Sequence, residues 1–202
     1  MQLLYNNIPA LLTQRPNWVV WGVRDSPPKS PFNPASLLSG RPFPAKAGVP
    51  ETWDSFHNAV LCVEQGLAQG IGYEFDGSVY GVDLDSVIDE AGAISPQAKE
   101  IVGKLNSYTE ISPSGKGLHI FVLAPGANIS RHRKKDYFLE IYKEGRYFTV
   151  TGNSYRVRTA NRDTNNICNS GNPYRVNGNF LGAIANLTPI VMTPCPYRIV
   201  IF

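Results

Sequence analysis

The chain contains several apolar runs of strand length, and acidic residues interrupt some of them. In the run of residues 79–85, the aspartates Asp83 and Asp85 are separated by a single leucine. Because successive side chains of a strand point to opposite faces, both carboxylates should project from one face, while Val82 and Leu84 point into the core. The chain therefore has to build a sheet whose covered face is apolar and whose other face carries two neighbouring acids.

The same periodicity predicts an α+β (mixed α/β) domain. Strand patterns cover residues 18–23, 71–75, 79–85, 108–111, 118–123, 137–142 and 146–151. Tight turns are expected at Asp76-Gly77 and at Glu144-Gly145, each between two of these strands. The order of strands and helices predicts a mixed or antiparallel sheet flanked by helices, which we expect on one face.

Two helices are expected. Within residues 51–67, apolar side chains recur at steps of three and four, at Trp53, Phe56, Val60, Val63 and Leu67. Pro50 near the first turn and Gly70 past the end agree with a helix there. The second helix should begin after Ser95 and Pro96 and end at Asn106, and its buried positions are Ile101, Val102 and Leu105. Residues 24–50, dense in proline, glycine and serine, indicate a long ordered loop.

Composition bounds the function only loosely. A chain of 202 residues with 43% hydrophobic content can bury one good core, and a net charge of +3 gives modest support for a polyanionic partner. The three cysteines, Cys62, Cys168 and Cys195, have no zinc-site spacing, so we expect reduced thiols in a cytoplasmic protein. No window has the length and apolarity of a membrane span or a signal peptide.

A turn of residues 112–117 joins two expected strands and has the composition of a phosphate-binding loop. Ser112 and Ser114 offer hydroxyls, Lys116 offers a positive charge, and two glycines allow close approach of the backbone. It lacks the spacing of a Walker loop, so no P-loop ATPase is inferred. His119 follows directly, and although most strand-edge histidines have structural roles, this position favours a donor to a phosphate oxygen.

Glu140 is an acid in the middle of an otherwise apolar strand, a position that requires a partner. A metal ion would be one such partner and an arginine another. Arg146 is the nearest candidate in sequence, either as an ion-pair partner or as a clamp on a triphosphate, and the sequence leaves both roles open. An isolated pair such as Asp83 and Asp85 is often only a solvated strand end, so the pattern gains weight from its combination with the other motifs.

In combination, these motifs resemble the amino-terminal primase-polymerase domain of the archaeo-eukaryotic primase superfamily, in its phage and plasmid branch. The resemblance covers most of residues 8–153. It rests on the ordered segments Trp18-Val-Val-Trp21, Pro31-Phe-Asn-Pro34, Thr52-Trp-Asp-Ser-Phe56, Gly70-Ile-Gly-Tyr73, Gly81-Val-Asp-Leu-Asp85, 107–119, Glu140-Ile-Tyr142 and Arg146-Tyr-Phe-Thr-Val-Thr-Gly152.

This resemblance implies an RRM-like catalytic core that performs template-dependent nucleotidyl transfer onto a 3'-hydroxyl. It places the metal-binding and catalytic acids at Asp83, Asp85 and Glu140, which would hold two divalent ions, Mg²⁺ or Mn²⁺. The implied nucleotide-binding residues are those of the turn, Ser112, Ser114 and Lys116, together with His119 and Arg146. The substrates would be nucleoside triphosphates, ribo- or deoxyribo-, on a single-stranded DNA template.

The densest basic run is a candidate for template binding, with Arg131, Arg133, Lys134 and Lys135 as its cationic residues. Residues 1–155 are expected to form the catalytic domain and the asparagine-rich residues 156–202 an accessory segment of unknown role. A replicative helicase is a candidate partner encoded separately. Two other function classes remain open: a non-catalytic module that binds single strands or origins, and a metal-dependent nuclease or nucleotide hydrolase.

Overall fold

The computed structural model describes residues 4–124, 132–133 and 138–155, and for 132–133 it describes the backbone. Its centre is a sheet of six strands in which every strand pair of the described residues is antiparallel. Five of the strands follow the order β3-β4-β2-β6-β5. The remaining strand, β1, pairs with residues 70–73 at the beginning of β2. The predicted α+β class is confirmed, and of the mixed and antiparallel alternatives the antiparallel one holds.

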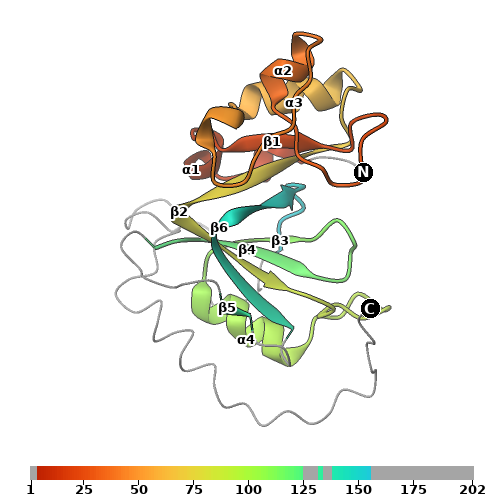
Figure 1. The fold of residues 1–202 in the computed structure, drawn as a ribbon. Helices are drawn as coiled ribbons and strands as arrows, with labels where there is room; N and C mark the ends of the chain where they lie inside the picture. Colours follow the sequence, from red (N-terminus) through yellow and green to blue (C-terminus); the bar gives the residue numbers. More distant parts are fainter. Residues whose placement is uncertain (1–3, 125–131, 134–137, 156–202) are drawn as a thin grey trace.

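The helices are short and pack in two groups. Their bounds are Ala10–Thr13 for α1, Pro34–Leu38 for α2, Phe56–Glu64 for α3 and Pro96–Leu105 for α4, and 3-10 turns η1 and η2 cover Tyr5–Asn7 and Pro50–Thr52. The strands are β1 (Trp18–Trp21), β2 (Gly70–Leu84), β3 (Tyr108–Ile111), β4 (Leu118–Leu123), β5 (His132–Arg133) and β6 (Leu139–Val150). Figure 1 shows α2 and α3 beyond β1, and α4 at the opposite end of the molecule.

The described residues contain three clusters of buried apolar residues, and the two larger ones explain this arrangement. One core joins α1 and α3 to β1 and to alternate residues of the sheet, among them Tyr73, Phe121 and Phe148. The other joins α4 to the intervening residues of β2 and β4, such as Val82 and Ile120. Because alternate residues of a strand point to opposite faces, the helices cover both faces of the sheet, and the expectation that all helices lie on one face is wrong.

The second helix was predicted correctly, and the first only in part. α4 begins after Ser95, whose hydroxyl accepts a hydrogen bond from the Ala98 N–H, and ends at Asn106 with a left-handed φ of 42°. By contrast, α3 begins after its own N-cap Ser55, and its buried residues are Ala59 and Cys62. Phe56 and Val63 of the expected stripe also pack against this core, whereas Leu67 lies beyond the helix and is exposed. The loop before it is ordered as predicted, but it contains α2.

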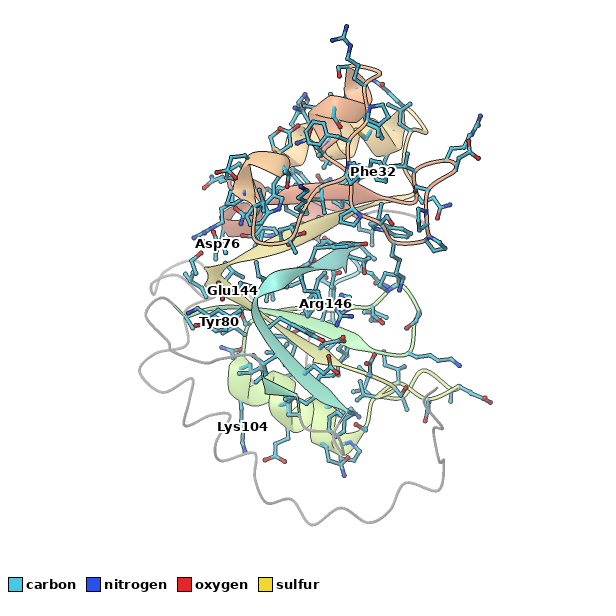
Figure 2. All side chains as sticks on the ribbon, in the orientation of Figure 1. Phe32, Asp76, Tyr80, Lys104, Glu144 and Arg146 are labelled. Carbon is cyan, nitrogen blue, oxygen red and sulfur yellow. The ribbon has the colours of Figure 1, made fainter. Side chains whose placement is uncertain are left out.

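The two expected turns are bends within continuous strands. β2 runs from residue 70 to 84 without reversing, and both of its halves pair with β6. The register is irregular where Asp76 faces Glu144, which Figure 2 shows next to each other. Arg15 fixes this bend, because its Nη1 donates to Ser78 Oγ at 2.6 Å and lies 3.3 Å from Asp76 Oδ2. Glycine at positions 77 and 145, both with positive φ, therefore serves a paired bulge.

A glycine in the middle of β2 leaves room for two aromatic rings, those of Phe75 and Phe148. A methyl group at Gly81 would lie 2.3 Å from Phe75 Cζ and 2.7 Å from Phe148 Cε2. We expect Gly81→Ala to lower the free energy of unfolding by about 2 kcal/mol through overpacking. Gly103→Ala in α4 is the matched control, since nothing lies within 4 Å of an added methyl there. That variant should be more stable by about 0.5–1 kcal/mol, and urea denaturation of both measures the contrast.

The predicted division of the chain at residue 155 stays a prediction, because residues 156–202 lie outside the described residues. Cys62 is a free, buried thiol in α3, and Cys168 and Cys195 also lie outside them. Within the described part of the chain, no helix has the length and apolarity needed to cross a membrane.

Candidate active site

Four ionisable side chains form a row across four adjacent strands. The strand register places Glu110 of β3 opposite His119 of β4, His119 opposite Asp83 of β2, and Asp83 opposite Glu140 of β6. Residues directly opposite each other in an antiparallel pair project from the same face. The acids Asp83 and Glu140, which lie far apart in the sequence, therefore meet beside the histidine, as the sequence predicted.

Asp83 lies at the centre of this row and is mostly buried. Burial raises the pKa of its carboxyl group to about 6. His119 lowers this pKa, and its Nε2 lies 3.8 Å from Asp83 Oδ1. The negative charges of Asp85 and Glu140 raise this pKa, and the Arg146 guanidinium lowers it. Because these charge effects oppose one another, the raised pKa reflects mainly the burial of Asp83.

Asp85 follows the last residue of β2 and is exposed. Its backbone N–H donates to the carbonyl oxygen of Phe138 at 2.8 Å, so the pairing of β2 with β6 continues one residue beyond the strand. This keeps Asp85 on the side of the sheet that Asp83 occupies, near enough to raise the pKa of that carboxyl. The three predicted acids are thus brought to one end of the β2-β6 pair.

Of the two partners that the sequence left open for Glu140, the structure shows the arginine, together with a tyrosine. The hydroxyl of Tyr142 donates a hydrogen bond to Glu140 Oε2. Arg146 Nη1 donates to the Tyr142 hydroxyl oxygen at 2.5 Å and lies 3.8 Å from the same carboxylate oxygen. The guanidinium also lies over the tyrosine ring, 4.8 Å from its centroid. Since about half of the Arg146 side chain is exposed, it remains accessible to an anionic ligand beside the acids.

The turn of residues 112–117 packs against the end of β2. A methyl group at Gly117 would lie 2.7 Å from the carbonyl oxygen of Leu84, so the close approach depends on glycine. Ser112 Oγ accepts from the Gly117 N–H at 3.2 Å and lies 3.0 Å from Ser114 Oγ. Ser114 and Lys116 are exposed. The structure therefore brings the predicted phosphate-binding turn next to the acids.

His119 is buried and held from several sides. Its Nδ1 lies 3.1 Å from the carbonyl oxygen of Thr149, and its ring stacks on Phe148 with centroids 4.5 Å apart. Nε2 is the ring nitrogen nearer to Asp83. Its predicted contact with a phosphate remains a prediction, but the ring already has a defined orientation.

The predicted template residues are described only in part. Arg131, Lys134 and Lys135 lie outside the described residues. Arg133 belongs to β5, where its backbone pairs with Glu140. The backbone of Arg133 therefore lies at the edge of the sheet beside Glu140, and a role of the basic run in template binding remains a prediction.

Sequence reasoning missed two acids that the structure makes prominent. Glu110 is the end residue of the row on β3. Glu74 of β2 is fully buried. Each interrupts an apolar strand, which is the same signal that identified Glu140. Tyr142 was also missed as the residue that links Arg146 to Glu140.

Comparison with known proteins identifies a relative of this chain. The chain is 33% identical over 160 residues to a protein described as the DNA primase-polymerase of Nitratiruptor phage NrS-1. The match covers 75% of this chain and 21% of that protein, so the chain spans about a fifth of the length of its relative. A scan against protein-family models gave no match. The resemblance to the phage type is confirmed: the chain is homologous to one part of a phage DNA primase-polymerase.

Proposed function

We propose that this chain is a template-dependent nucleotidyltransferase that synthesises and extends primers on single-stranded DNA. The observation that carries the proposal is the meeting of Asp83, Asp85 and Glu140 at one end of the sheet, beside His119 and a serine- and lysine-containing turn. Homology to a phage DNA primase-polymerase supports the same chemistry.

Two divalent ions, Mg²⁺ or Mn²⁺, fit the donor set of this site. In the described part of the chain, no three histidine, cysteine or acidic side chains are grouped closely enough to hold an ion as they stand. Burial, however, makes the charged form of Asp83 unfavourable and raises the pKa of its carboxyl group, and a bound cation would offset that cost. Asp83, Asp85 and Glu140 would hold the ions, which when bound stabilise charge on the transferred phosphate.

The other residues have roles in binding the nucleotide. Ser112, Ser114 and Lys116 lie where the triphosphate would approach the acids, and hydroxyl and ammonium donors suit phosphate oxygens. His119 presents Nε2 toward the same space. Arg146 would bind a phosphate through the guanidinium edge that its contact with Tyr142 leaves exposed. Together these groups orient the α-phosphate for attack by a 3'-hydroxyl.

The DNA strand would pass along the basic segment that contains Arg133, with its phosphates neutralised by lysine and arginine. A separately encoded replicative helicase would supply the single strand. We place this reaction in the cytoplasm of the host cell, where replicating mobile-element DNA and nucleotides are present.

The deciding experiment measures incorporation of labelled nucleotide on a defined single-stranded DNA, with Mg²⁺ or Mn²⁺ added and with an Asp83→Ala variant as control. Products whose sequence follows the template support primase-polymerase activity. Binding of the strand without incorporation would instead indicate a non-catalytic module. Release of mononucleotides without extension would indicate a nuclease or hydrolase.

Arg146 offers a more local test of nucleotide binding. Removing its guanidinium in Arg146→Ala should raise the KM for the nucleoside triphosphate about tenfold, because a charge-assisted contact to phosphate is lost. We expect kcat to change less, since the acids remain in place. The control is Lys104→Ala, which removes a cation on α4, far from the site and paired with Glu100. Equal KM values for both variants would remove Arg146 from the nucleotide site.

A further inference from the structure

Glu110 is a carboxylate with no exposed surface, in the short strand β3. Its Oε1 and Oε2 accept hydrogen bonds from the Thr151 N–H at 3.1 and 3.2 Å, and Oε2 also accepts from the Gly152 N–H at 3.0 Å. The Tyr108 hydroxyl donates to Oε2 at 3.0 Å. These three donor groups are the partners that suit a carboxylate, and they hold Glu110 at the end of the row.

The backbone that Glu110 holds is the segment that holds His119. Thr151 and Gly152 directly follow β6, and the carbonyl oxygen of Thr149, two residues before Thr151, lies 3.1 Å from His119 Nδ1. A carbonyl oxygen can only accept, so Nδ1 has to carry the hydrogen of this bond. Glu110 Oε1 lies 3.9 Å from the same nitrogen. Its charge therefore favours a hydrogen on Nδ1 in addition to fixing the carbonyl that receives it.

We propose that Glu110 is a positioning residue that fixes both the orientation of the His119 ring and the hydrogen on Nδ1, so that Nε2 points toward Asp83 and the nucleotide site. The importance of His119 for activity rests on the proposed function, whereas the state of its ring does not. The stacking of Phe148 on the His119 ring restricts the tilt of that ring. The rotation of the ring within its plane and the position of its hydrogen are then left for Glu110 to control.

Replacement by glutamine separates this role from a purely structural one. In Glu110→Gln the remaining carbonyl oxygen of the side chain can still accept a backbone N–H, but the negative charge near Nδ1 is gone. Glu74→Gln controls for the removal of a buried carboxyl group elsewhere in the sheet, because Glu74 is equally buried and does not belong to the row. Loss of a structural hydrogen bond alone would lower stability without altering the ring nitrogens of His119.

The first measurement is the nitrogen NMR spectrum of the His119 ring, with the assignment made by comparison with His119→Ala. The wild-type protein should show a hydrogen on Nδ1, and Glu110→Gln should transfer a measurable fraction of it to Nε2, whereas Glu74→Gln should not. A wild-type ring whose single hydrogen is on Nε2 would overturn the proposal without any variant of Glu110. An unchanged spectrum in Glu110→Gln would also overturn it.

The second measurement is kinetic. Glu110→Gln should lower kcat/KM for nucleotide incorporation about tenfold, the size expected when a carboxylate that orients a histidine is neutralised. In a His119→Ala background the same change should have little effect, because there is no ring to position. Independent, multiplicative losses would refute a role through His119. If the wild-type protein incorporates no nucleotide, the proposed function fails, and the NMR result still decides the role of Glu110.

Discussion

Asp83→Asn is expected to reduce nucleotide incorporation about a thousandfold and to leave a protein that is at least as stable as the wild type. The loss is expected because an asparagine cannot supply the charge that a divalent ion requires at the centre of the acid row. Stability should not fall, because burial raises the pKa of Asp83 to about 6, which means that its charge is unfavourable in the folded state.

The sign of this effect can be checked against pH. A carboxyl group whose folded pKa is raised from 3.8 to about 6 contributes stability at low pH that is lost as the pH rises through 6. The asparagine variant lacks this loss, so at pH 8 without metal it should gain about 3 kcal/mol over the wild type. Glu90→Gln, an exposed acid outside the row, is the control for both measurements. A variant that kept incorporating nucleotide would remove Asp83 from the catalytic site.

Glu74→Gln should abolish a second and larger pH dependence of stability. Glu74 has no exposed surface, and among the described residues neither of its carboxylate oxygens has a hydrogen-bond partner. Burial raises the pKa of this group from 4.5 to about 7. The folded wild-type protein should therefore lose about 3 kcal/mol of stability between pH 4.5 and pH 7, because the folded state has to give up a proton that it binds more tightly than the unfolded chain does.

Chemical denaturation at pH 5 and pH 8 measures this change. The glutamine variant should show a smaller difference between the two pH values than the wild type, with the residual slope coming from Asp83. Glu144→Gln is the control, since Glu144 lies on β6 in the same sheet but is exposed. A wild-type protein with equal stability at both pH values would show that Glu74 stays charged in the fold, with a partner to stabilise it.

The sequence predicted those parts of the fold that depend on local chemistry. The helix α4 was predicted correctly because Ser95 and Asn106 define its ends and its apolar residues are spaced regularly. The turns at Asp76 and Glu144 were wrong because a glycine with positive φ fits a bulge as well as a hairpin turn. The partner strand decides between the two, and pairing between residues so far apart is not encoded locally.

In the candidate site, too, the sequence predicted what depends on local pattern and missed what depends on strand pairing. Alternation along a strand was enough to place Asp83 and His119 on the correct faces, and the acid in an apolar strand identified Glu140. Their proximity required the register of three strands, which the sequence suggested only through resemblance to a family. Glu110 was missed although it carries the same signal, because its function depends on residues that lie across β4 and beyond β6.

The continuity of β2 restricts how this protein can be dissected. Its first half buries Ile71, Tyr73 and Phe75 among the amino-terminal helices, and its second half carries the acid pair. A truncated version that begins at residue 70 would keep every proposed catalytic group and yet leave an aromatic surface in contact with water. Fragments made for crystallisation or for fusion to other enzymes should therefore retain the amino-terminal helices, even though none of their residues is proposed to take part in the chemistry.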